Sequence, residues 1–263
     1  MSGDQFRAVV IDREGDTQRT TIRMVDEGQL PQGDVLIGID ASSINYKDGL
    51  LVTGAFLLIQ SFPTVPGIDL TGTVERSTHP KWKAGDSVIA NGLGLGERHW
   101  GGYADKCRLN GDWLIARPAR FTAVQVMAIG TAGYTAVLCV LALERQGVKP
   151  GDGEILVTGA SGGVGSVAIS LLAGRGYRVV AATSRASEEP YLLYLGAAPL
   201  PDRTELAEPG ATLQKERWAG VLAAAGSQTL ANICASLKYG GTVRATGIAH
   251  GPDFPTTMYA ARR

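Results

Sequence analysis

One stretch constrains the fold of this chain more than any other. It covers residues 155–185, with the sequence ILVTGASGGVGSVAISLLAGRGYRVVAATSR. An apolar run, Ile155–Val157, leads into a glycine-rich turn, and apolar residues at helical spacing follow as far as Leu172. Two glycines then precede a second apolar run, Val179–Ala182. The pattern predicts a strand, a tight turn, a helix and a second strand, which together form a βαβ unit.

The turn of this unit has the sequence GASGGVG, from Gly159 to Gly165. The strict dinucleotide-binding pattern is G-x-G-x-x-G, whereas the spacing here is G-x-x-G-G-x-G. Glycine serves the same purpose in both, because the backbone can turn sharply and approach a pyrophosphate that the next helix N-terminus attracts. The turn therefore favours a dinucleotide site. The alternative is a purely structural glycine loop.

The end of the second strand indicates which dinucleotide binds. Proteins that bind NAD usually carry an acidic residue about twenty positions after the glycines, bonded to the ribose 2′-hydroxyl. Here the strand ends in Thr183-Ser184-Arg185, and the first acidic residue is Glu188. Ser184 can hydrogen-bond a 2′-phosphate, and the guanidinium of Arg185 can pair with it. We predict NADPH as the cofactor; the alternative is that Arg185 is a solvated surface residue.

Composition argues against several other classes of protein. The chain of 263 residues carries 25 basic and 25 acidic side chains, so charge does not favour a nucleic acid as partner. No apolar run approaches the length of a membrane span, and we expect no membrane partner. The three cysteines and three histidines lack the spacing of metal ligands, and we expect no metal. Widely separated cysteines suit a reducing compartment, which predicts a cytoplasmic protein.

Residues 1–115 are predicted to be mainly β. Short apolar or alternating runs are separated by polar turns that contain glycine and proline. These runs are Phe6–Ile11, Asp34–Ala41, Gly72–Glu75 and Asp86–Ala90. Their spacing favours a compact β-barrel-like domain over a βαβ array.

The remaining residues alternate helices and strands. Apolar periodicity predicts helices over 122–129 and 131–144, joined near Gly130. After the βαβ unit we expect a helix over 188–195, a strand over 218–225, a helix over 227–237 and a strand over 241–248. This order completes a doubly wound parallel sheet, and we place the domain boundary near Pro118.

A polar cluster follows the predicted strand 34–41. Its sequence is SSINYKD, from Ser42 to Asp48, with an amide, a phenol, an amine and a carboxylate in four consecutive positions. Such groups can orient a carbonyl, relay a proton or fix a nicotinamide amide. The catalytic candidates are Asn45, Tyr46 and Asp48. The alternative is a polar helix start, with a serine as the cap and Asp48 in the first turn.

Several motifs, taken in order, resemble the medium-chain dehydrogenase/reductase superfamily. They are SSINYKDGL at 42–50, FPTVPGIDLTGTV at 62–74, HWGGYAD at 99–105, GTAGYTA at 130–136, DGEILVTGASGGVGS at 152–166 and YGGTVRATGIA at 239–249. Within the superfamily they look like the zinc-free acrylyl-CoA reductase branch, many members of which are called quinone oxidoreductases. The resemblance implies a GroES-like β-barrel domain at 1–118, a Rossmann domain at 119–257 with NADPH in the cleft between the two, and an unassigned tail at 258–263.

The resemblance also implies the residues that contact the cofactor. They are Tyr46, Thr131, Ser161, Gly162, Gly163, Val164, Ser184, Arg185, Arg203, Gly247 and Ile248. Residues 161–164 would hold the pyrophosphate, and Ser184 and Arg185 the 2′-phosphate, with Arg203. Tyr46 and Asn45 would lie beside the nicotinamide and the substrate.

The activity that the resemblance implies is reduction of the activated C=C bond of an acrylyl-CoA-type enoyl thioester by hydride transfer from NADPH. Charge then develops on the thioester oxygen, where Tyr46 or backbone N–H groups could stabilise it. A proton must reach the α-carbon, from Tyr46 or from water. Two alternatives are an NADPH:quinone oxidoreductase and a non-catalytic NADPH-binding protein.

The family pattern is incomplete at the end of this sequence. Relatives continue through a dimer-forming strand and then through segments that return to the first domain, whereas this sequence stops soon after Pro255. The family suggests a homodimer. The resemblance predicts that the dimer-forming and return segments are missing here, which would leave strand edges and apolar surface uncovered.

Overall fold

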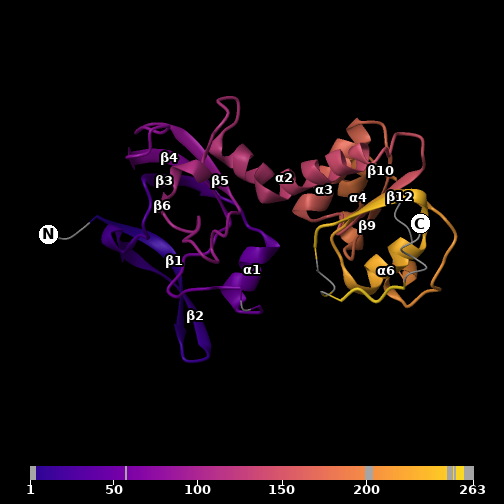
Figure 1. The fold of residues 1–263 in the computed structure, drawn as a ribbon, viewed down its shortest axis with the longest axis horizontal. Helices are drawn as coiled ribbons and strands as arrows, with labels where there is room; N and C mark the ends of the chain where they lie inside the picture. Colours follow the sequence, from indigo (N-terminus) through magenta and orange to yellow (C-terminus); the bar gives the residue numbers. More distant parts are fainter. Residues whose placement is uncertain (1–3, 57, 199–203, 248–250, 252, 258–263) are drawn as a thin grey trace. The chain divides into compact units, whose positions relative to one another are not determined.

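The structure is a computed structural model that describes residues 4–56, 58–198, 204–247, 251 and 253–257. The chain divides into two compact units, Met1–Thr131 and Ala132–Arg263, which we call unit 1 and unit 2. Figure 1 shows unit 1 in indigo to magenta and most of unit 2 in orange to yellow. The domain boundary near Pro118 stays a prediction.

Unit 1 is built from antiparallel sheets, as its alternating sequence predicts. β1 (Gln5–Glu14) and β2 (Thr17–Asp26) form a two-stranded sheet. The second sheet has the order β6-β3-β4-β5-β7, formed by Lys106–Leu109, Val35–Ser42, Asp69–Ser77, Ser87–Asn91 and Ile115–Ala116. The expected barrel-like domain is thus divided between two sheets. Its short helical elements are η1 (Glu27–Gln29), α1 (Tyr46–Thr53) and η2 (Gly111–Trp113).

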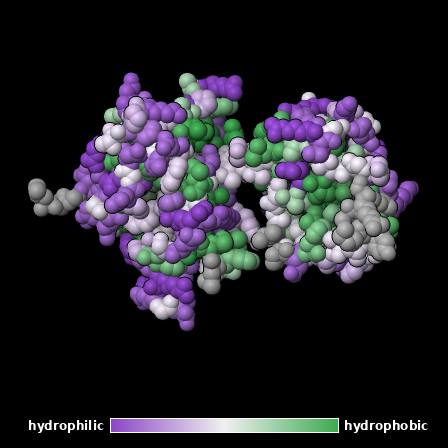
Figure 2. Space-filling model, in the orientation of Figure 1, coloured by the Kyte–Doolittle hydropathy of each residue, from purple (hydrophilic) through white to green (hydrophobic). Residues whose placement is uncertain are grey.

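The strand β2 is one that the sequence analysis does not predict. Of the side chains of β2, Val25 alone is buried, so the strand has no apolar alternation of its own. Its backbone pairs with β1 along its full length. Figure 2 shows hydrophilic residues at the far tip of this hairpin, the lowest point of the view. Pairing with a neighbour, rather than burial of its own side chains, therefore defines β2.

The long helix α2 (Ala123–Arg145) contains the break that the sequence predicts. Gly130 has φ 47° and ψ −159°, so two helical segments meet there. The prediction that no apolar run approaches the length of a membrane span is wrong for α2. By length and composition alone, the helix is long and apolar enough to cross a membrane. In the structure, 44% of its most apolar stretch is buried. Its second segment supplies Val140 and Leu143 to the core of unit 2, which is how a core helix packs.

Unit 2 is a parallel sheet with helices, which confirms the predicted doubly wound fold. The strand order is β10-β9-β8-β11-β12, formed by Ala197–Ala198, Arg178–Ala182, Glu154–Thr158, Trp218–Ala223 and Leu237–Ala245. Counted within the unit this order is 3-2-1-4-5, typical of nucleotide-binding sheets. Besides the second segment of α2, the helices are α3 (Gly163–Gly174), η3 (Ala186–Glu188), α4 (Glu189–Tyr194), α5 (Thr204–Ala207) and α6 (Ser227–Ala235). The strand predicted over 241–248 begins earlier, at Leu237.

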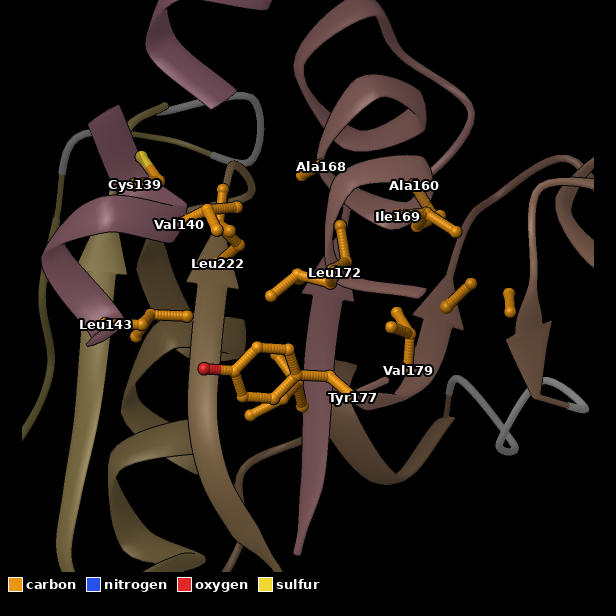
Figure 3. Packing of buried hydrophobic residues seen from close by; sticks show 14 of the residues in the cluster. Cys139, Val140, Leu143, Ala160, Ala168, Ile169, Leu172, Tyr177, Val179 and Leu222 are labelled. Carbon is orange, nitrogen blue, oxygen red and sulfur yellow. The ribbon is translucent and has the colours of Figure 1, made fainter. Parts of the chain in front are cut away.

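The main core of unit 2 fixes α3 against the sheet. Ile169 and Leu172 of α3 pack with Val179 of β9 and Leu222 of β11 in one buried cluster (Figure 3). Tyr177 lies in the same cluster, and its Oη donates a hydrogen bond to the carbonyl of Val148 at 2.8 Å. This packing holds the start of α3 at the end of β8.

Glycine is required where α3 begins. A Cβ on Gly165 would lie 2.5 Å from the carbonyl oxygen of Gly159 and 2.7 Å from Cα of Ala160. Both are backbone atoms, so no side-chain rotation can relieve the contact. Gly159 itself has φ +60°, which favours glycine.

We expect Gly165→Ala to lower the free energy of unfolding by about 1–3 kcal/mol, because the added methyl group displaces the turn. Chemical denaturation measures the change. Gly174→Ala, at the other end of α3, is the matched control, because nothing lies within 4 Å of a Cβ there. Equal losses of stability in the two variants would contradict this account of the turn.

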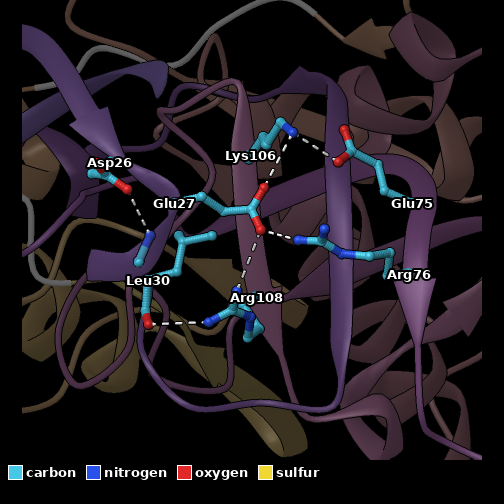
Figure 4. A network of polar contacts seen from close by, with 8 residues as sticks. Asp26, Glu27, Leu30, Glu75, Arg76, Lys106 and Arg108 are labelled. Carbon is cyan, nitrogen blue, oxygen red and sulfur yellow. Dashed lines mark hydrogen bonds and ion pairs between the residues drawn. The ribbon is translucent and has the colours of Figure 1, made fainter. Parts of the chain in front are cut away.

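A group of charged side chains connects η1 to the second sheet of unit 1, which contains β4 and β6 (Figure 4). The carboxylate of Glu27 pairs with Arg76 of β4 and lies 3.4 Å from Nζ of Lys106 and 3.7 Å from Nη2 of Arg108, both on β6. Its side chain is only 13% exposed, so these charges interact more strongly than a solvated pair. Glu27 therefore connects the β1–β2 hairpin to β4 and β6.

We expect Glu27→Gln to destabilise the protein by about 1–3 kcal/mol, because three cations lose a shared, half-buried anion. Asp16→Asn is the control: Asp16 lies 3.6 Å from Arg13 with a fully exposed side chain, and such pairs contribute about 0–1 kcal/mol. Urea titrations of both variants make the comparison. A loss for Glu27→Gln no larger than that for Asp16→Asn would show that the charge cluster adds little stability.

Candidate functional site

The carboxyl ends of the central strands of unit 2 meet at one edge of the sheet. The backbone N–H of Ala160, in the glycine-rich turn, donates to the carbonyl of Ala182 at the end of β9 at 3.1 Å. The N–H of Ala224, just after β11, donates to Oγ1 of Thr158 at the end of β8 at 3.0 Å. Open α/β sheets bind ligands at this edge, where the strand order reverses. The order here reverses between β8 and β11.

The residues predicted for a pyrophosphate lie together at the start of α3. Gly162 precedes the helix, and Gly163 and Val164 are its first two residues. The N–H of Gly162 donates to the carbonyl of Gly159 at 2.9 Å within the turn. The N–H groups of Gly163 and Val164 have no acceptor within the helix, because the first turn has no preceding carbonyls. Ser161 shares a 2.8 Å hydrogen bond with Thr183 of the next strand end. Free donors and the positive end of a helix dipole suit an anion, so the predicted cofactor fits this turn.

The residues predicted for the 2′-phosphate directly follow β9. Ser184 and Arg185 are exposed, whereas Thr183 is buried. The N–H of Arg185 donates to Oγ1 of Thr183 at 3.2 Å, and Thr183 also bonds Ser161. The structure therefore brings Ser184 and Arg185 to the glycine-rich turn, with no acidic residue between β9 and Arg185.

Three further residues predicted to contact the cofactor are Gly247, Arg203 and Ile248. Gly247 lies beside the end of β11, where its Cβ would be 2.5 Å from the carbonyl oxygen of Ala224. The close approach of two backbones explains a glycine at that position. Arg203 and Ile248 lie outside the described residues.

The catalytic candidates of unit 1 lie at the start of α1. Tyr46 is the first residue of the helix, and its side chain is exposed. Asp48 is buried, and its two carboxylate oxygens accept the backbone N–H groups of Asn45 and Ile68, each at 2.9 Å. Asp48 lies in the first turn of α1, as the polar helix start predicts, but the N-cap is Asn45 rather than a serine. A direct catalytic role for Asp48 stays a prediction.

The residue at the centre of this cluster is Asp69, to which the sequence analysis assigns no role. Its buried carboxylate accepts Oγ of Ser43 at 2.7 Å, Nδ2 of Asn45 at 3.2 Å and the backbone N–H of Thr131 at 2.8 Å. It also accepts Nδ2 of Asn91 at 2.9 Å and the hydroxyl of Thr131. Asp69 thus brings together Asn45 and Thr131, two predicted site residues that are far apart in the sequence. The signal for it is an acidic residue between two apolar ones at the start of a buried strand.

Tyr103 is a second residue near this cluster without a predicted role. Burial raises the pKa of its phenol, and the carboxylates of Asp48 and Asp69 raise it further. Its Oη donates to the carbonyl of Ser43 at 3.1 Å. Tyr103 therefore stays protonated and supports the loop that carries Asn45.

The part of the chain that the structure describes contains no candidate metal site. No three His, Cys, Asp or Glu side chains gather there in a group that could hold a metal ion. Burial raises the pKa of the Cys107 thiol to about 12, so this cysteine stays protonated at neutral pH.

Comparison with known proteins supports the same two-part division. Residues 31–142 match the alcohol dehydrogenase GroES-like domain family, and residues 155–235 match the NAD dependent epimerase/dehydratase family. The chain is 47% identical to the probable acrylyl-CoA reductase AcuI of Escherichia coli and 43% identical to the acrylyl-CoA reductase AcuI of Ruegeria pomeroyi. Each match covers 96% of this chain and 78% of the relative. The putative quinone oxidoreductase YhfP of Bacillus subtilis is 37% identical, over 97% of this chain and 77% of that protein.

Solved structures agree in fold and in the kind of ligand they hold. Escherichia coli K-12 YhdH with bound NADPH superposes with a TM-score of 0.93 at 47% identity, over 96% of this chain and 78% of that one. The YhdH oxidoreductase of Salmonella enterica in complex with NADP gives 0.92 at 46%, over 97% and 78%. Bacillus subtilis YhfP with NAD bound gives 0.91 at 36%, over 98% and 79%. The predicted GroES-like domain followed by a Rossmann domain is confirmed, and the chain belongs to the medium-chain dehydrogenase/reductase superfamily.

Proposed function

We propose that this chain reduces the activated C=C bond of an acrylyl-CoA-type enoyl thioester with NADPH. The observation that carries the substrate class is the identity of 47% and 43% to two proteins named acrylyl-CoA reductases, each over 96% of the chain. The fold alone would not support it, because one fold hosts many activities.

The cofactor proposal is supported by unit 2 itself. NADPH supplies a hydride when bound. Residues 161–164 would hold its pyrophosphate, with the N–H groups of Gly163 and Val164 as donors, and Ser184 and Arg185 would hold its 2′-phosphate, with Arg203. Gly247 and Ile248 would lie under the cofactor. The exposed Ser184 and Arg185, beside a turn with free N–H groups, are the features that favour a phosphorylated ribose.

The reaction requires a hydrogen-bond donor and a proton. Hydride addition at the β-carbon moves negative charge onto the thioester oxygen, so a donor at that oxygen stabilises the transition state more than the ground state. We assign this donor to Tyr46, whose phenol is exposed at the start of α1. A proton from Tyr46 or from water then reaches the α-carbon, which completes the saturated thioester and NADP⁺. Asn45 and Thr131 would lie beside the nicotinamide.

A quinone is the second candidate substrate, since YhfP, named a putative quinone oxidoreductase, is 37% identical. NADPH oxidation with acrylyl-CoA and with benzoquinone, offered separately, decides between them. We expect kcat/KM to be at least about tenfold higher for acrylyl-CoA, a difference of about 1.4 kcal/mol in transition-state binding. A preference for benzoquinone would replace the proposal. No turnover with either, together with an NADPH-dependent rise in Tm, would indicate a non-catalytic NADPH-binding protein.

The proposal extends to the setting of the enzyme. We propose a cytoplasmic protein acting on a small molecule, with its GroES-like domain ending near Pro118. The family suggests a homodimer, whereas the predicted absence of the dimer-forming segment favours a monomer for this sequence. Light scattering coupled to size-exclusion chromatography decides between them: a dimer mass at working concentration would contradict the prediction that this segment is needed.

Arg185→Gln is expected to weaken NADPH binding about 10- to 100-fold, because a charge-assisted bond to the 2′-phosphate is lost. NADH has no such phosphate, so its Kd should change less than about twofold. Fluorescence titration with both cofactors measures the difference. Arg178→Gln is the control, since Arg178 lies at the other end of β9 and pairs with Glu154 at 3.0 Å. Equal weakening of NADPH and NADH by Arg185→Gln would remove Arg185 from the 2′-phosphate site.

Tyr46→Phe is expected to lower kcat for acrylyl-CoA about 100-fold, because the phenol that donates in the transition state is gone. NADPH affinity should stay within about twofold, since Phe keeps the aromatic ring of Tyr46 and the residues proposed to bind the phosphates are in unit 2. Steady-state kinetics on this variant and on Tyr194→Phe, whose side chain is exposed on α4, provide the comparison. Unchanged turnover for Tyr46→Phe would exclude Tyr46 from the chemistry.

A further inference from the structure

We propose that Asp69 is a positioning residue that sets the hydrogen-bonding polarity of the site in unit 1. Its carboxylate and the hydroxyl of Ser43 take up both side-chain N–H groups of Asn45, and the carboxylate takes up the hydroxyl proton of Thr131. Asn45 and Thr131 can then only accept a hydrogen bond from a ligand. The inference rests on the proposed function, in which Asn45 lies beside the nicotinamide and the substrate and Thr131 lies near the nicotinamide.

Burial makes the hydrogen bonds of Asp69 obligatory. The residue is 0% exposed, and an ionised carboxylate in such a place requires donors around it. Its Oδ2 accepts three donors and its Oδ1 accepts two. A carboxylate offers about four lone-pair positions, so this one is saturated and has none left for a ligand. Asp69 therefore acts through its neighbours.

The carboxylate fixes which way the amide of Asn45 points. Nδ2 of Asn45 lies 3.0 Å from Oγ of Ser43 and 3.2 Å from Oδ2 of Asp69. Oγ of Ser43 gives its own proton to Asp69 at 2.7 Å, so it accepts from the amide. A flipped amide would place its carbonyl oxygen against two acceptors. Both N–H groups thus point inward. Oδ1 faces the backbone N–H of Asp48 in the capping box of α1, and its second lone pair is what Asn45 offers a ligand.

The carboxylate of Asp69 also determines which hydrogen bonds Thr131 can make to a ligand. The threonine hydroxyl has one proton and donates it to Oδ1 of Asp69, while its backbone N–H donates to Oδ2. The helix break makes this approach possible: a Cβ on Gly130 would lie 2.8 Å from Oδ2 of Asp69, and φ there is +47°. The oxygen of Thr131 is therefore also restricted to accepting from a ligand.

A division of roles follows within unit 1. Asn45 and Thr131 suit a ligand group with N–H or O–H protons, such as the carboxamide of a nicotinamide. Neither can donate to the oxygen on which charge develops. Among the predicted site side chains of unit 1, Tyr46 is then the neutral side chain left to donate, since Asp48 is a carboxylate held by two backbone N–H groups.

The first test does not depend on turnover. Hydrogen exchange of the Asn45 side-chain NH₂, followed by NMR in the cofactor-free protein, reports whether both N–H groups are bonded. We expect exchange at least about tenfold slower than for the side-chain NH₂ of the exposed Asn110, and a return toward the Asn110 rate in Ser43→Ala. Equal rates for Asn45 and Asn110 in the unmodified chain would overturn the proposal.

The second test measures coupling in the reaction. Ser43→Ala removes the acceptor of one Asn45 N–H without touching a group that faces a ligand, and it avoids emptying the buried Asp69 site. We expect kcat for acrylyl-CoA to fall about tenfold with the KM for NADPH within twofold, and Asn45→Ala/Ser43→Ala to match Asn45→Ala alone. Effects of the two substitutions that multiply would show that Ser43 and Asp69 do not act through Asn45.

Ser42→Ala is the matched control for the second test. Ser42 is the adjacent serine, and its Oγ bonds the backbone carbonyl of Asp69 at 2.7 Å rather than the carboxylate. We expect its kcat to equal that of the unmodified chain. If the unmodified chain turns over neither acrylyl-CoA nor benzoquinone, the proposed function fails, and the exchange measurement still decides the role of Asp69.

Discussion

A carboxylate without solvent must be surrounded by hydrogen-bond donors, and unit 1 is arranged around that requirement at Asp69. The donors come from the loop after β3, from the end of β5 and from the break in α2. Three segments that are distant in the sequence are thereby held at one point. Five hydrogen bonds offset the free-energy cost of removing the Asp69 carboxylate from water. The result is a rigid set of polar groups whose donors face the carboxylate.

The two units present different kinds of chemical group to a ligand. Unit 2 presents backbone N–H groups at the start of α3, and glycine at Gly159 and Gly165 lets the backbone come close enough to do so. Unit 1 presents side chains, and their orientation depends on a buried charge. A backbone site tolerates many side-chain changes outside its glycines, whereas the side-chain site depends on each member of its network. The phosphate-binding turn and the reacting groups are therefore expected to respond differently to mutation.

The sequence predicted those parts of the fold that depend on local patterns. The βαβ unit around Gly159 follows from an apolar run, a glycine turn and helical spacing, and the break at Gly130 follows from a glycine between two periodic segments. β2 could not be predicted in this way, because it has one buried side chain and is formed by pairing with β1. The apolar length of α2 was also misjudged, since Gly130 and Thr131 interrupt the periodicity but not the overall hydrophobicity.

The candidate site shows the same limit. Asn45 and Tyr46 could be found from a dense polar cluster after a strand, but Asp69 stands alone among apolar residues, and its five partners come together only in the folded chain. The proposed reaction is defined by the carbon atom that receives the hydride. Acrylyl-CoA should be incubated with this chain and NADPH deuterated at both C4 positions, and the product analysed by mass spectrometry and NMR. We predict propionyl-CoA with a single deuterium at C3; deuterium at C2, or no propionyl-CoA at all, would contradict the proposed reaction.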